Sequence, residues 1–238
     1  MNLPDGVLLV DKPQDWTSHD VCAFVRKRFK IKKVGHAGTL DPLATGLLVL
    51  LLGQATKLSM TLSSCDKDYA GIMELGIKTS SQDKQGNVLA TASYEGVTLE
   101  KIREAAKQFS GEITQVPPMV SAIKHQGVPL YKFARRGVEV PREGRPVHVY
   151  RLDIEKMEGP LVHFSTKVSK GTYVRTLVHD LGESLGCYAA LAGLRRTRSG
   201  KFSVEDSVTV EMLRRWTIEE LREKIFSMRA CDASLHKV

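Results

Sequence analysis

The feature that most constrains the fold is a run of six apolar residues at 47–52, which directly follows the segment GHAGTLDPLATG at 35–46. A run of this length is typical of a buried strand, although periodicity alone also permits a buried helical segment. Pro42 lacks an N–H and disfavours a helical conformation for Asp41, so the carboxylate is expected in a loop. The sequence therefore predicts an acidic side chain carried by a loop at the edge of a core element.

Glycines surround this carboxylate. Gly35, Gly38 and Gly46 allow a left-handed backbone or a close approach of the main chain to a ligand. Loops held by a rigid scaffold often carry catalytic groups. From the residues alone, an ordinary Asp-Pro turn with loop glycines is the alternative interpretation.

The composition favours a polyanionic partner. The chain has 238 residues, 42% of them hydrophobic, which is enough for one substantial core or two small ones. Its formal charge is +8, and the basic residues cluster at 26–33, 132–145 and 195–201. A charged run is often only a solvated face, but three clusters together favour nucleic acid as the partner.

Several classes of site are excluded by pattern. The four cysteines are Cys22, Cys65, Cys187 and Cys231. They form no C-x-x-C pair, which argues against a zinc site and against a disulfide framework. Such scattered cysteines suit a reducing compartment. No signal pattern or membrane-length apolar run is present, so we expect a cytoplasmic protein without a membrane partner. No metal-ligand spacing, Walker or dinucleotide pattern occurs, so we expect no metal and no cofactor.

The hydrophobic periodicity and the positions of turn-forming residues predict interspersed strands and helices without a regular βαβ alternation. This pattern is typical of an α+β fold. Strands are expected at 6–10, 69–75, 147–154 and 162–168. Helices are expected after Thr17 and Ser18, at 54–63, 99–109 and 177–185, and twice after residue 203, with Thr217 and Glu220 as a capping box. Residues 79–86 and the basic segment at 116–146, with its interspersed aromatics, are expected to be loops.

The segment at 35–46 resembles the signature of the TruB family of pseudouridine synthases, which convert a T-loop uridine of tRNA to pseudouridine. Five further segments resemble the family in the same order, at 8–13, 66–69, 116–124, 170–175 and 194–196. The resemblance implies one catalytic domain over 1–238, built on a mixed, largely antiparallel central sheet with flanking helices. It also implies a thumb-like, RNA-clamping insertion at about 116–146.

The resemblance implies a role for each matching residue. Asp41 would be the nucleophile, Arg175 would pair with it, and Tyr69 would stack on the target base and assist proton removal. A guanidinium fork can orient a carboxylate and keep it ionised. The substrate-binding residues would be His36, Tyr173, Leu194, Asp83 and Lys12, with Lys12 as structural support. The RNA backbone would contact Lys124, Lys132, Arg135, Arg136, Arg195 and Arg196.

Many family members carry a C-terminal RNA-binding domain of the PUA type. Only 31 residues follow Ser207, so no separate domain of this kind is expected here. Two other functions stay open, namely a non-catalytic RNA-binding protein or tRNA-folding chaperone, and a synthase for another RNA with a T-loop-like fold. A monomer is the default expectation. The sequence leaves open whether Asp41 attacks the sugar C1′ or the base C6.

Overall fold

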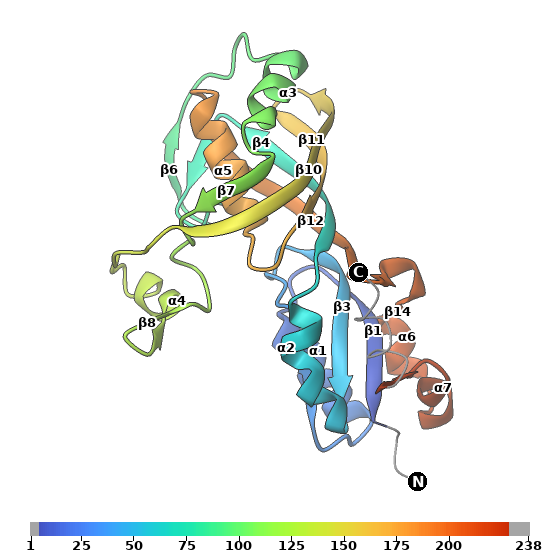
Figure 1. Ribbon diagram of the computed structural model, residues 1–238. Coiled ribbons are helices and arrows are strands. Elements are labelled where there is room, and N and C mark those ends of the chain that lie inside the picture. Colours follow the sequence, from blue (N-terminus) through green and yellow to red (C-terminus); the bar gives the residue numbers. More distant parts are fainter. Residues whose placement is uncertain (1–4, 229–238) are drawn as a thin grey trace. The chain divides into compact units, whose positions relative to one another are not determined.

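The computed structural model describes residues 5–228, and the chain divides into two compact units (Figure 1). One unit comprises Met1–Tyr69 and Leu194–Val238, and the other comprises Ala70–Gly193. Strands β4 (Lys67–Leu75) and β12 (Ala189–Ser199) carry the chain from one unit into the other. Within the described range, no helix is both long and apolar enough to cross a membrane.

The first unit is built on β1 (Gly6–Lys12) and β3 (Thr45–Leu52), which pair antiparallel along their length. The strand order is β14-β1-β3-β12, with β14 (Val208–Thr209) parallel to β1 and β12 parallel to β3. Short strands β2 (Val34–His36), β13 (Phe202–Ser203) and β15 (Phe226–Ser227) pair with β3, β12 and β1 respectively. Segments from the two ends of the sequence therefore share one sheet.

The apolar run at 47–52 is a strand, which decides between the two alternatives left by periodicity. Successive side chains of a strand point to opposite faces. Leu48, Leu50 and Leu52 enter one buried cluster, whereas Leu47, Val49 and Leu51 enter a second one. Because both faces of β3 are covered, every position of the run is apolar.

The helices of the first unit begin where the sequence predicts. In α1 (Ser18–Arg28), Thr17 accepts a hydrogen bond from the Asp20 main chain in a complete capping box. Helices α6 (Val210–Arg215) and α7 (Ile218–Glu223) follow near the C-terminus, and the predicted Thr217–Glu220 capping box is confirmed. The helix predicted at 54–63 differs, because it divides into a 3-10 helix, Gly53–Leu58, and α2 (Ser59–Ser63).

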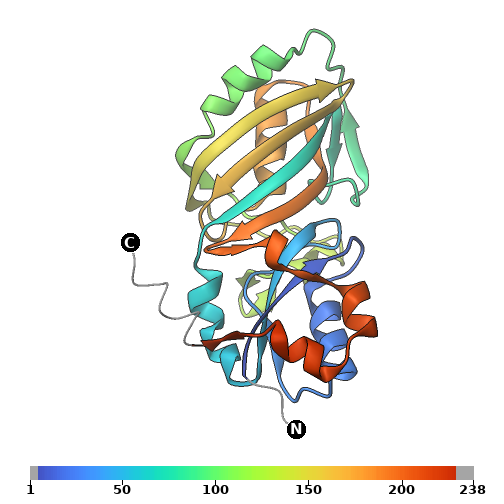
Figure 2. The same ribbon diagram turned by 90° about the vertical axis from the view of Figure 1, so that its right-hand side faces the viewer.

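The second unit is a sheet in the order β12-β4-β11-β10-β7, with two helices on one face (Figure 2). Its strands include β11 (Leu161–Val168), β10 (Arg145–Glu158) and β7 (Gly111–Gln115). Helices α3 (Leu99–Lys107) and α5 (Val174–Ser184) contact each other on that face. A separate hairpin joins β5 (Ile77–Thr79) to β6 (Val88–Thr91). The α+β class and the mixed, largely antiparallel sheet are thereby confirmed.

The basic segment at 116–146 contains more local structure than the loop predicted for it. Strands β8 (Lys124–His125) and β9 (Val128–Pro129) form a hairpin, and α4 (Leu130–Ala134) follows directly. The turn between the two strands uses Gln126 and Gly127, both with positive φ. The buried side chain of Leu130 anchors α4.

Candidate active site

The main chain that precedes Asp41 is held in place by hydrogen bonds to β3 and to the start of α1. On its N-terminal side, the Ala37 N–H donates to the carbonyl of Val49 on β3 over 2.9 Å. The buried hydroxyl of Ser18, at the start of α1, contacts both main-chain groups of Leu40. It accepts from the Leu40 N–H at 2.8 Å and donates to the Leu40 carbonyl at 3.2 Å. We call residues 37–46 the Asp41 loop.

Lys12 holds Pro42, the residue that follows Asp41. Its ammonium is completely buried and donates to the carbonyl oxygens of Pro13 (2.9 Å), Trp16 (2.6 Å) and Pro42 (3.4 Å). Burial lowers the pKa of Lys12 to about 8, and the negative charge of Asp41 opposes this shift. The Asp15 N–H also donates to Pro42, over 2.9 Å. The Asp41 carboxylate is therefore carried by a segment fixed on both of its sides.

Arg196 lies in a different environment from the one predicted. Its side chain is only 1% exposed, and its guanidinium donates to the carbonyls of Leu47 at 2.7 Å and Gly38 at 3.1 Å. The predicted contact with an RNA backbone is wrong for this residue, because a buried guanidinium cannot reach a polyanion outside. Neighbouring Arg195 is partly exposed and forms a two-pronged ion pair with Asp11, at 3.0 and 2.7 Å.

Three other predicted site residues belong to this unit. His36 is half-buried on β2, and burial lowers the pKa of its imidazole, with further contributions from the charges of Arg196 and His19. A neutral imidazole is therefore expected at neutral pH. Tyr69 and Leu194 are half-buried and pack against the core cluster that lies between β1, β3 and α1. Tyr69 is at the start of β4, and Leu194 precedes the two arginines on β12.

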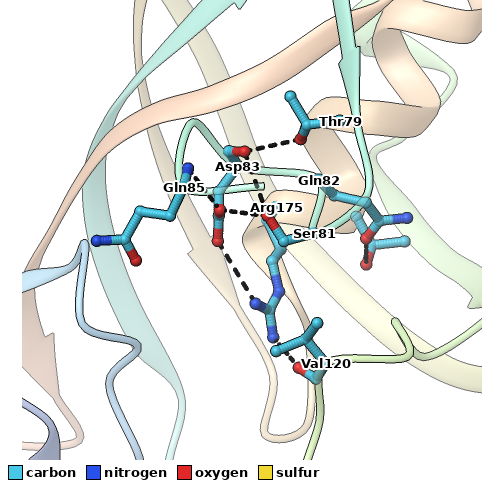
Figure 3. Close-up of polar contacts among 8 residues, drawn as sticks. Thr79, Ser81, Gln82, Asp83, Gln85, Val120 and Arg175 are labelled. Atoms are coloured by element: carbon cyan, nitrogen blue, oxygen red, sulfur yellow. Dashed lines mark hydrogen bonds and ion pairs between the residues drawn. The ribbon is translucent and has the colours of Figure 1, made fainter. Parts of the chain in front are cut away.

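In the second unit, Arg175 and Asp83 form a buried ion pair (Figure 3). Arg175 lies in the first turn of α5, as the sequence predicts, and its side chain is 4% exposed. One terminal nitrogen lies 3.5 Å from the Asp83 carboxylate, and the other donates to the Val120 carbonyl over 2.5 Å. The pair therefore links α5 to the loop after β5 and to the basic segment at 116–146.

The loop around Asp83 is itself highly ordered by polar contacts (Figure 3). The carboxylate of Asp83 accepts hydrogen bonds from the Ser81 hydroxyl at 2.5 Å and the Gln85 N–H at 3.0 Å. Its main-chain carbonyl accepts from the Thr79 hydroxyl at 2.7 Å. A bridge between Asp83 and Leu191 ties the loop to β12. The predicted loop at 79–86 is thus a rigid platform for Arg175.

Tyr173 is positioned by a residue that sequence reasoning missed. The buried side-chain amide of Gln115, at the end of β7, accepts from the Tyr173 N–H at 2.7 Å and donates to its carbonyl at 3.1 Å. The guanidinium of Arg175 lies 5.7 Å from the centre of the Tyr173 ring. Neither Gln115 nor Ser18 stands in a distinctive sequence pattern, because each is recognised only by the main chain that it meets.

Replacing Asp83 with asparagine is expected to lower the free energy of unfolding by about 3 kcal/mol, because the substitution removes a buried counter-charge from Arg175. Urea denaturation followed by circular dichroism measures this change. Lys156→Gln removes one partner of an ion pair whose side chains are both more than half exposed, and it should leave the unfolding curve unchanged. Equal curves for Asp83→Asn and wild type would contradict the expected role of the pair.

The basic segment presents exposed cations on the hairpin, on α4 and directly after α4. Lys124, Lys132, Arg135 and Arg136 are all exposed, and the Arg135 guanidinium lies 5.3 Å from the centre of the Tyr131 ring. Cations in this position can contact a phosphate backbone. In the part of the chain that the structure covers, no group of His, Cys, Asp or Glu side chains is arranged to hold a metal ion. Cys22, Cys65 and Cys187 are free thiols, and Cys231 lies outside the described residues.

Two family models match the chain in succession. The N-terminal domain of TruB family pseudouridylate synthases matches residues 26–174, and the C-terminal domain of tRNA pseudouridylate synthase B matches residues 175–235. The chain belongs to the TruB family of pseudouridylate synthases. Among TruB proteins, it is 49% identical over 231 residues to tRNA pseudouridine synthase B of Opitutus terrae, covering 97% of this chain and 96% of that one. It is 48% identical to the Geotalea uraniireducens protein of the same name, covering 87% of this chain and 67% of that one.

Solved structures agree with the TruB assignment. A chain in the crystal structure of a Cbf5-Nop10-Gar1 complex is 33% identical and superposes with a TM-score of 0.74. A chain in an H/ACA RNP bound to a substrate RNA containing 2′-deoxyuridine is 30% identical, with a TM-score of 0.70. In both cases the match covers 94% of this chain and 60% of the other. The TruB family fold therefore accounts for nearly the whole described chain.

Proposed function

We propose that this protein is a tRNA pseudouridine synthase that isomerises a uridine in the T-loop. The single observation that carries the proposal is the 49% identity, over nearly full length, to a protein named tRNA pseudouridine synthase B. The fixed main chain of the Asp41 loop supports it, because a nucleophile carried by a preorganised segment suits covalent catalysis. The two units together would form one catalytic domain, acting as a cytoplasmic monomer without a metal or a cofactor.

The reaction breaks the C1′–N1 bond of uridine and joins C1′ to C5 of the same base. The target base is flipped out of the stacked loop at a cost of about a few kcal/mol. In the proposed mechanism Asp41 is the nucleophile, Arg175 orients its carboxylate, and Tyr69 stacks on the base and assists removal of the C5 proton. The neutral imidazole of His36 contacts the RNA and helps the base to leave the stack.

Other residues would hold the RNA. A T-loop is recognised mainly by shape, stacking and backbone contacts rather than by reading a duplex. We assign stacking and apolar contact with the flipped base to Tyr173 and Leu194, and support of the pocket to Asp83 and Lys12. The exposed cations of residues 116–146 and partly exposed Arg195 would contact phosphates. The exposed set on the insertion is Lys124, Lys132, Arg135 and Arg136.

The test is tritium release from an unmodified tRNA transcript labelled at uridine C5. Release requires a new bond at C5, so wild-type protein should release tritium, and mapping should place pseudouridine in the T-loop. Tight RNA binding without release would contradict the proposal and favour a non-catalytic RNA-binding protein. Release from a uridine outside the T-loop would contradict the proposed target site. If the protein recognises the T-arm alone, an isolated T-arm hairpin should release tritium at the same rate as the full tRNA.

A further inference from the structure

Arg196 is one of the largest completely buried side chains among the described residues. Removing a guanidinium from water is costly unless hydrogen bonds compensate for the lost hydration. Its two hydrogen bonds run to main-chain carbonyl oxygens, those of Leu47 and Gly38. Because the buried guanidinium bonds to main-chain carbonyls, we infer that its structural role is to fix the positions of those two carbonyl groups.

The two carbonyls lie on opposite sides of Asp41 in the sequence. Gly38 precedes the carboxylate within the Asp41 loop, and Leu47 follows it on β3. Arginine nitrogens form a rigid, planar fork, so the two bonds fix one acceptor relative to the other. A single side chain therefore closes the Asp41 loop across its ends.

The main chain of Arg196 is independently anchored. It pairs with Gly46 in the parallel register between β12 and β3, and the adjacent pair is Arg195 with Thr45. The guanidinium thus extends from a strand that is already fixed to the loop's C-terminal end. Altering the side chain should free Gly38 and its neighbours while the strand pairing persists.

The charge of Arg196 also acts on the groups around the loop. Burial is the main cause of the lowered pKa of both His36 and Lys12. The positive charge of Arg196 also acts to lower the pKa of each group. Asp41 acts on Lys12 in the opposite sense. The Lys12 ammonium therefore lies within electrostatic reach of both the Arg196 guanidinium and the Asp41 carboxylate.

We propose that Arg196 is a positioning residue for Asp41, whose guanidinium holds the loop in the geometry that the reaction requires. This inference rests on the proposed function, in which Asp41 is the nucleophile. It predicts that Arg196 contributes to the chemical step and not to RNA affinity, which distinguishes it from the exposed basic residues. A displacement of about 1 Å at a reacting group can cost about 10²-fold in rate.

The experiment compares Arg196→Lys and Arg196→Met with Arg103→Met. Arg103 is a matched control, because its guanidinium also donates to two carbonyls, those of Ile154 at 3.0 Å and Glu155 at 3.2 Å, in the other unit. Single-turnover tritium release at saturating protein reports the chemical step, and filter binding reports the Kd for RNA. Thermal melting identifies variants that are folded, and Asp41→Asn is measured alongside.

Arg196→Lys should lower the single-turnover rate by about 10²-fold, because an ammonium lacks the fork that reaches both carbonyls. Its Kd should stay within about twofold of wild type, and Arg103→Met should react at the wild-type rate. A folded Arg196→Lys protein with the wild-type rate would overturn the inference, as would equal losses of rate and RNA affinity. If Arg196→Met does not fold, Arg196→Lys decides alone.

Asp41→Asn separates a failure of this inference from a failure of the proposed function. Wild-type activity in Asp41→Asn would overturn the proposed function and the inference with it. An inactive Asp41→Asn protein supports the nucleophile, and the rate of Arg196→Lys then tests the positioning role independently.

Discussion

Asp41→Asn is expected to slow tritium release by about 10⁴-fold or more, because the substitution removes the proposed nucleophile. Asparagine has nearly the volume of aspartate, and the bonds that hold the Asp41 loop use main-chain atoms of Ala37, Leu40 and Pro42. The loop should therefore keep its shape. The Kd for tRNA should stay within about threefold of wild type, as measured by filter binding under the same salt conditions.

Asp206→Asn is the control for this prediction, since Asp206 is an exposed carboxylate in a 3-10 helix of the same unit. It should release tritium at the wild-type rate. Comparable losses of rate and affinity in Asp41→Asn would show that the carboxylate serves binding. An active Asp41→Asn protein would remove Asp41 from the mechanism altogether.

Gly46→Ala is expected to lower the free energy of unfolding by about 4 kcal/mol, a large effect for a single methyl group. Gly46 has a φ of +94°, where side chains are strained. A Cβ atom at this position would also overlap the main-chain oxygen and nitrogen of Arg196 on the neighbouring strand. Relieving that overlap requires β3 and β12 to separate. Urea denaturation monitored by circular dichroism measures the loss.

Gly111→Ala separates the two causes. Gly111 has a nearly equal φ of +88°, but a Cβ atom there would meet open space. Only the backbone strain then applies, so the expected loss is about 1 kcal/mol. Equal losses for the two variants would show that the contact with β12 contributes nothing, contrary to the packing seen at Gly46.

Much of the fold follows from local sequence signals. The capping residues Thr17 and Thr217 predict where α1 and α7 begin, because a cap is a contact over three residues. Gly186, with a φ of +72°, follows the C-cap of α5, where a glycine commonly ends a helix. The alternation at 162–168 identifies β11 from its own residues. All the residues that form such a signal are close neighbours in the sequence, so the sequence alone reveals it.

Other features depend on contacts that no local pattern contains. The segment 194–196 carries a leucine and two arginines, and its sequence indicates a basic surface rather than a strand. In the structure it belongs to β12, and Arg196 is buried because Gly38 and Leu47, about 150 residues earlier, supply its acceptors. The roles of Ser18 and Gln115 likewise depend on main-chain partners from distant segments. The resemblance names the candidate residues, but it does not reveal what holds them.

The division of the first unit between the two ends of the chain has a consequence for biosynthesis. The second unit is continuous in sequence, from Ala70 to Gly193, so it can complete its core as soon as it has emerged from the ribosome. The first unit lacks β14 and Arg196 until the last fifth of the chain is made. These partners of β1 and β3 are far away in sequence, which makes their pairing slow. The Asp41 loop is consequently closed across its ends only late in synthesis, so a truncated translation product would contain the carboxylate without the two hydrogen bonds from Arg196.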